Sequence, residues 1–167
     1  MNKPASYAQH FCVCSIATLL CLGTVGASAQ VTSGVFSAML QPTQETPPIL
    51  TSSAFGNAFL EFDVASSMLC YSITYSDGGV PDLASGETVA HVHGPAEPGD
   101  SAPPVFDISP SPPGPSPVGS PKEGCVGPFS RAQRTALVDG LLYINIHSNA
   151  FPGGEIRGQI LFEQVYP

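Results

Sequence analysis

Three histidines are the residues of this chain best suited to bind a metal ion. His91 and His93 stand two apart in a run of strand-like composition, and His147 lies far along the chain in a second such run. Side chains two apart in a strand project from the same face, with Cα atoms about 6–7 Å apart. Three imidazoles suit zinc or copper and leave a fourth position for water or a carboxylate. His91, His93 and His147 are therefore the candidate metal ligands.

The same histidines also have a structural interpretation. They are the only histidines beyond residue 29, but a His-x-His pair alone is a weak signal, and such side chains can brace a sheet by hydrogen-bonding to backbone. Asp82, Glu87 and Glu97 are close enough in sequence to complete a metal site, and the sequence does not select among them. Two hypotheses follow: a copper or zinc site, and a structural or protein-interaction module without a metal.

The rest of the chain offers little catalytic chemistry. No serine lies in a nucleophile elbow, and the sequence contains neither a phosphate-binding Walker loop nor a Cys-x-x-Cys motif. We therefore expect a protein that is not an enzyme.

The segment from Phe151 to Gly158 is interpreted as structural. Its Pro-Gly-Gly sequence at 152–154 predicts a turn between two antiparallel strands. Glu155 and Arg157 would then share one face, where they are expected to form an ion pair or to bind cross-strand carbonyls. Gly158 is expected to allow the close approach of a neighbouring backbone.

Alternation of apolar and polar residues predicts an all-β fold, an antiparallel sandwich or barrel of Greek-key-like type, to position these residues. Short alternating runs bounded by Gly, Pro, Ser or Asp are typical of half-buried strands. The predicted strands are 35–40, 59–64, 69–75, 88–93, 141–147 and 155–165. One short helix is predicted over 131–138, because Ser130 and Gln133 fit a capping box and Asp139-Gly140 ends the turn.

Residues 95–128 differ in composition, because eleven of these 34 residues are proline. Only residues 105–108 inside this stretch are suited to pair as a strand. Since proline donates no hydrogen bond to a sheet, about 109–128 is predicted to be a long, exposed, Pro-rich loop. It is interpreted as an insertion, and a polyproline ligand for another protein is the alternative.

The first 29 residues have the layout of a secretory signal peptide. A weakly positive start precedes an apolar run and then Ala27-Ser28-Ala29, a cleavage signal of small residues. The apolar run is shorter than the roughly 20 residues of a membrane span, so cleavage is favoured over an uncleaved anchor. This predicts a secreted or periplasmic domain at 30–167, with no membrane insertion after cleavage.

Cleavage would leave two cysteines, Cys70 and Cys125, in an oxidising compartment. A disulfide between them would close a loop of about 55 residues and contribute at most roughly 4 kcal/mol, and two free thiols are the alternative. Beyond residue 29 the chain carries thirteen acidic residues against four cations, a balance of about −9. That charge argues against nucleic acid and anionic membranes as partners. An unidentified extracellular or periplasmic protein remains a possible partner.

The chain resembles the CHRD domain, the module named after chordin that also occurs singly in secreted microbial proteins. The resemblance covers about residues 33–163, and its motifs are Gln44–Pro48, Ala54–Ala58, Ala90–Ala96, Pro104–Asp107, Gly140–His147 and Phe151–Gln159. It implies an all-β, extracellular or periplasmic module at 30–167 with no defined biochemistry. The His-x-His-Gly motif is also similar to that of copper–zinc superoxide dismutase, but the paired metal site of that enzyme needs more than three histidines.

Overall fold

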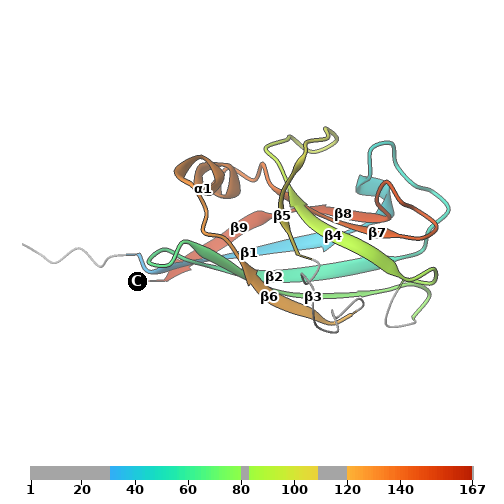
Figure 1. Cartoon of the computed structure of the whole chain (residues 1–167), viewed down its shortest axis with the longest axis horizontal. Coiled ribbons are helices and arrows are strands. Elements are labelled where there is room, and N and C mark those ends of the chain that lie inside the picture. Colours follow the sequence, from blue (N-terminus) through green and yellow to red (C-terminus); the bar gives the residue numbers. More distant parts are fainter. Residues whose placement is uncertain (1–30, 80–82, 109–119, 167) are drawn as a thin grey trace, which may run out of the picture.

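The described residues, 31–79, 83–108 and 120–166 of the computed structural model, form a two-layer antiparallel β-sandwich (Figure 1). One sheet has five strands in the order β6-β3-β2-β1-β9, and the other has four in the order β5-β4-β7-β8. The predicted all-β, antiparallel sandwich is therefore confirmed.

The strands divide between the two sheets. The five-stranded sheet contains β1 (Ser33–Leu40), β2 (Phe55–Asp63), β3 (Met68–Ser76), β6 (Lys122–Val126) and β9 (Leu161–Tyr166). The four-stranded sheet contains β4 (Glu87–His93), β5 (Pro104–Asp107), β7 (Tyr143–Ser148) and β8 (Ile156–Gln159). Two short helices, η1 (Pro42–Gln44) and α1 (Arg131–Val138), lie outside the sheets.

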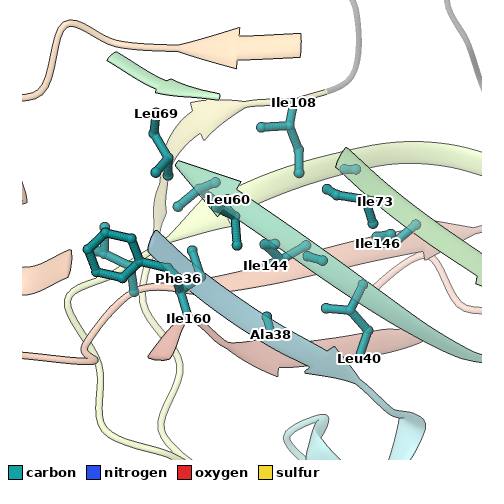
Figure 2. Close-up of a cluster of buried hydrophobic side chains, with 14 of the residues drawn as sticks. Phe36, Ala38, Leu40, Leu60, Leu69, Ile73, Ile108, Ile144, Ile146 and Ile160 are labelled. Atoms are coloured by element: carbon teal, nitrogen blue, oxygen red, sulfur yellow. The ribbon is translucent and has the colours of Figure 1, made fainter. Parts of the chain in front are cut away.

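The hydrophobic core lies between the two sheets and is built from alternate residues of each strand (Figure 2). Phe36, Ala38 and Leu40 of β1 point inward, and they meet Ile144 and Ile146 of the opposite sheet, which are fully buried. Burial of one such large side chain contributes about 1.5–3 kcal/mol. Because the side-chain period is two, this inward register turns the intervening residues of β7 to the outer face of its sheet.

Helix α1 begins and ends as the sequence predicts. The Ser130 hydroxyl accepts a hydrogen bond from the backbone N–H of Gln133, and the Gln133 side chain accepts one from the backbone N–H of Ser130. This reciprocal cap satisfies two N–H groups that the helix itself leaves free. Ala136 and Leu137 are buried, so α1 packs one face against the sandwich beside β9.

The last predicted strand forms two strands in the structure. Residues 155–165 divide at Ile160 into β8, which belongs to the four-stranded sheet, and β9, which pairs with β1 in the other sheet. Ile156 and Ile160 are buried, but Phe162 is 44% exposed and packs edge-on against Phe36. The prediction of one continuous strand over 155–165 was therefore wrong, because the chain crosses between the sheets at Ile160 and the alternation does not continue through the crossing.

The Pro-rich loop is also shorter than the sequence predicted. Lys122–Val126 forms β6, which pairs antiparallel with β3, whereas the sequence predicted an exposed loop to residue 128. This run lies between Pro121 and Pro128, neither of which must donate to the β3–β6 ladder. The middle of the loop, 109–119, and the predicted signal peptide, 1–29, lie outside the described residues. Within the described part, no helix is long and apolar enough to cross a membrane.

Candidate metal centre

The three histidines lie on the outer face of the four-stranded sheet, where β4 and β7 pair side by side. Ala90 and Val92 of β4 are buried in the core, so His91 and His93 project the other way. His147 projects from the same outer face of β7, because Ile146 before it points inward. The alternation predicted from the sequence therefore brings all three rings to one face.

The rings converge closely. One nitrogen from each of His91, His93 and His147 lies within 4.8 Å of the other two. The centroid of the His91 ring is 5.3 Å from the centroids of both other rings, and those two are 6.3 Å apart. His93 and His147 are each 9% exposed. The cluster is thus a largely buried group of three imidazoles at one point of the sheet.

Backbone carbonyls fix the tautomers of two rings. Nδ1 of His93 donates to the carbonyl of Ala102 at 2.8 Å, and Nδ1 of His147 donates to the carbonyl of Pro152 at 3.0 Å. A carbonyl only accepts, so the proton of each neutral ring is on Nδ1 and the lone pair is on Nε2. This is the arrangement by which proteins usually orient histidines that bind a metal.

Three nitrogens in the cluster lack a hydrogen-bond partner. They are Nε2 of His93, Nε2 of His147 and Nδ1 of His91, and all three are buried. Buried polar atoms are nearly always hydrogen-bonded, and an unsatisfied one costs about 1–3 kcal/mol. One unpartnered nitrogen on each ring makes the three histidines the candidate ligands of this site.

Burial keeps two of the rings neutral. Burial lowers the pKa of His91, and the charge of His147 adds to this while Asp107 opposes it. Burial also lowers the pKa of His93, against the effect of its bond to Ala102. A neutral imidazole is the form that binds a metal, so neither ring needs to release a proton at neutral pH.

The site needs only a small contraction to hold an ion. Tetrahedral zinc has Zn–N distances of about 2.0–2.1 Å, which places two nitrogen ligands about 3.3–3.4 Å apart. One nitrogen of each histidine ring lies within 4.8 Å of one nitrogen of each other ring. Modest ring rotations of the histidines would close that difference.

Tyr143 supports the centre from β7. Its ring stacks on that of His93, with centroids 4.9 Å apart and planes 10° from parallel. Its hydroxyl accepts from the backbone N–H of Ala102 and donates to the carbonyl of the same residue. Arg157 places its guanidinium carbon 3.6 Å from the centroid of the Tyr143 ring. The sequence does not identify Tyr143 as part of the site, because only the fold shows that the loop before β5 folds back over it.

Of the acidic residues considered as further ligands, the two that the structure describes do not join the cluster. Glu87 instead forms a buried ion pair with Lys122 at 2.8 Å and accepts a hydrogen bond from the hydroxyl of Tyr75. Glu97 is exposed, and Asp82 lies outside the described residues. No pattern in the sequence pairs Lys122 with Glu87, since the two residues come from different sheets.

Glu155 lies just before β8 and Arg157 lies within it, and the two side chains do not pair with each other. Glu155 accepts a hydrogen bond from the hydroxyl of Ser52 at 2.7 Å, and Nη1 of Arg157 donates to the hydroxyl of Thr46 at 3.2 Å. The expected ion pair or carbonyl contacts are replaced by bonds to the segment after η1. That segment is long enough to fold over the outer face and reach both side chains.

Gly158 and the two cysteines have the structural positions expected of them. A Cβ on Gly158 would collide with the backbone carbonyl of Met39, so β1 and β8 approach closely there. Cys70 and Cys125 form a disulfide and lie directly opposite each other in the register of β3 and β6. The disulfide thus fastens the edge strand β6 to its sheet.

The sequence was compared with models of known protein families. The CHRD domain model matches residues 36–160, so the chain belongs to the CHRD domain family, whose members are non-enzymatic modules of extracellular proteins. Neither a comparison with curated proteins nor one with solved structures gives a match.

Proposed function

We propose that this CHRD-domain protein binds one copper or zinc ion through His91, His93 and His147. Two observations support the proposal: one nitrogen of each ring lies within 4.8 Å of one nitrogen of each other ring, and each ring has one buried nitrogen without a hydrogen-bond partner. A single cation would satisfy all three lone pairs at once. Imidazole suits both ions, and three protein ligands leave a fourth position for water or another ligand.

The surroundings suit binding at neutral pH. The carbonyls of Ala102 and Pro152 hold two of the rings in the tautomer that presents Nε2. His91 is less buried than His93, so the cluster is closer to solvent at His91 than at His93. An ion could therefore enter without unfolding the sandwich.

We propose binding rather than turnover as the role of the centre, in a secreted or periplasmic protein. Membership of the CHRD family supports a non-enzymatic extracellular module. The disulfide between Cys70 and Cys125 is consistent with an oxidising compartment.

Metal titration of the purified domain, residues 30–167, tests the proposal. Calorimetry with Cu²⁺ and with Zn²⁺, each against a competing chelator, should give one equivalent bound by the intact protein. His91→Ala, His93→Ala and His147→Ala should each weaken binding at least about 100-fold, since each removes a direct ligand. Thr88→Ala is the matched control, because Thr88 is an exposed residue of β4 that is not paired with any of the three histidines in the β4–β7 register.

Two outcomes would contradict the metal proposal. If neither ion binds stoichiometrically, or if binding survives each histidine substitution, the metal proposal is wrong. Loss of thermal stability in His93→Ala without any bound metal would instead support the structural or protein-interaction module.

A further inference from the structure

The outer face of the five-stranded sheet, turned away from the four-stranded sheet, carries exposed apolar side chains (Figure 1). Alternate residues of β1 and β2 point into the core, so Met39, Phe55 and Phe59 point to this outer face. Leu161 of β9 lies opposite Ser37 of β1 in the register and shares the same face. The four apolar side chains are 52–60% exposed. Apolar side chains gathered in this way on a surface with a polar rim are typical of an interaction site.

Exposed carboxylates surround Phe59 on this face. Glu61 follows Phe59 by two residues in β2 and therefore projects from the same side of the strand. Glu123 of β6 lies in the same cross-strand row as Phe59, two strands or about 9–10 Å away. Glu163 of β9 lies two strands away in the other direction, where it accepts a hydrogen bond from the hydroxyl of Ser37. Phe59 is thus an exposed aromatic ring among three carboxylates.

No basic side chain of the described residues lies on this face. Beyond residue 29 the chain has four cations, and two of them, Lys122 and Arg157, are only 1% and 2% exposed. The other two, Arg131 and Arg134, belong to α1, whose buried residues join the core between the two sheets. The outer face of the five-stranded sheet is therefore acidic and has no counter-charge from the chain itself.

A shallow hollow opens at one end of this face. Its volume is about 180 Å³, and it is lined by the uncharged residues Phe55, Asn57, Thr74, Tyr75 and Ser76. Since Phe55 and Phe59 are four residues apart on one side of β2, the hollow lies about 13 Å from the ring of carboxylates. The face thus offers a place for an apolar side chain within a short distance of three negative charges.

We propose that this face docks a segment of another extracellular protein in which basic side chains are interspersed with apolar ones. The apolar side chains cover Phe59 and Leu161 and enter the hollow, and the basic side chains pair with the surrounding carboxylates. A lysine or arginine over the exposed ring of Phe59 gains a further cation–π attraction. Charge selects this occupant, because a second copy of the chain placed face to face would bring carboxylates against carboxylates.

The test uses the purified metal-free domain and involves no histidine, so a failed metal titration would leave its result unaffected. The probe is a fluorescent peptide of three Lys-Leu repeats. Of two matched peptides, Glu-Leu repeats reverse the charge and Lys-Ser repeats remove the apolar side chains. Fluorescence anisotropy should give a Kd of about 1 mM or below for the Lys-Leu peptide, at least about tenfold tighter than for either matched peptide. The affinity should fall between about 50 mM and 500 mM salt, which screens exposed charges.

Two variants locate the binding on the sheet. Phe59→Ser removes the exposed ring and Glu61→Gln removes the nearest carboxylate, and each should weaken binding of the Lys-Leu peptide at least about fivefold. Leu50→Ser and Glu97→Gln are the matched controls, because both residues are exposed and lie in loops outside the five-stranded sheet. The two controls should leave the affinity unchanged.

Four results would overturn the inference. Three of them concern the peptides: no binding of the Lys-Leu peptide up to about 1 mM, equal binding of it and of either matched peptide, and unchanged binding by both Phe59→Ser and Glu61→Gln. The fourth is a dimer in analytical ultracentrifugation that Phe59→Ser abolishes, which would show that a second copy of the chain covers the face.

Discussion

His93 and Tyr143 stack ring on ring, and both bind the carbonyl of Ala102. The hydroxyl of Tyr143 donates to that oxygen at 3.2 Å, and Nδ1 of His93 donates to it at 2.8 Å. Tyr143 thereby positions both the ring of a candidate ligand and the acceptor that fixes its tautomer. Ala102, in the loop before β5, thus contacts the histidine cluster both directly and through Tyr143.

Tyr143→Phe should weaken metal binding without abolishing it. The substitution keeps the stacked ring and removes the hydroxyl bonds to Ala102, so the acceptor of His93 becomes less well held. Partners of this kind typically contribute about 10–100-fold in affinity, and we expect the lower end because the His93 bond itself remains. Calorimetry with the competing chelator measures the change.

The control for that variant is Tyr71→Phe, which removes a hydroxyl bond to the carbonyl of Ile108 in the other sheet. It should leave metal affinity unchanged. Equal losses in the two variants would show that the effect on the centre is general destabilisation.

Gly158→Ala should destabilise the sandwich where β1 and β8 meet. The added Cβ would lie 2.8 Å from the carbonyl carbon of Met39, a backbone atom that cannot move aside cheaply. A cost of at least about 2–3 kcal/mol in the free energy of unfolding is expected in urea titration.

Gly153→Ala serves as its comparison, because a Cβ there meets nothing within 4 Å. That change should alter stability by less than about 0.5 kcal/mol. A Gly158→Ala protein as stable as the Gly153→Ala protein would refute the close approach of the two strands.

The buried pair of Lys122 and Glu87 links the two sheets, and its loss should be costly. Both side chains are 1% exposed, and Lys122→Met would leave the carboxylate of Glu87 buried without the cation beside it. Breaking a buried pair from one side typically costs about 3–5 kcal/mol. Urea titration should show this loss for Lys122→Met.

The double variant Lys122→Met with Glu87→Gln should recover part of that loss, because it removes both charges. Additive effects of the two changes in a double-mutant cycle would contradict a direct interaction.

Glu45 should make the protein less stable as pH rises. Burial raises its pKa to about 7 in the folded protein against 4.5 for the free side chain, so between these values the folded state holds more protons than the unfolded state. The free energy of unfolding therefore falls as pH increases through this window. Arg157 is the charged group that faces Glu45, and it acts in the opposite direction.

Comparison with Glu45→Gln isolates this contribution. Relative to the unmodified protein, the variant should gain about 1–3 kcal/mol between pH 4.5 and pH 8. Chemical denaturation at several pH values measures the gain, and a constant difference across that range would show that Glu45 titrates normally.

The sequence was sufficient to predict that His91 and His93 share one face of their strand. The structure adds that Ala90, Val92 and Ile146 point inward, so His91, His93 and His147 lie on the outer face. The capping box at Ser130 is likewise local and was predicted correctly. A helix cap depends only on neighbours in the sequence, and the face of a strand residue depends on a period of two. Features of these two kinds can be predicted from the sequence.

Features that depend on which segments meet in space were not predictable. β6 forms because it pairs with β3, and nothing in the composition of Lys122–Val126 predicts that pairing. The carbonyls of Ala102 and Pro152, which orient two rings, belong to loops whose paths only the fold defines. A cavity lined by Glu45 and Arg157 arises in the same way, from a segment that folds back over β8.

X-ray absorption of the domain loaded with one equivalent of copper or zinc tests the central claim most directly, because it counts the ligands. The account predicts a first coordination sphere with three imidazole nitrogens, at about 2.0–2.1 Å for zinc, and the loss of one imidazole in the His147→Ala protein. A sphere with fewer than three imidazoles, or one that is unchanged in the His147→Ala protein, would contradict it.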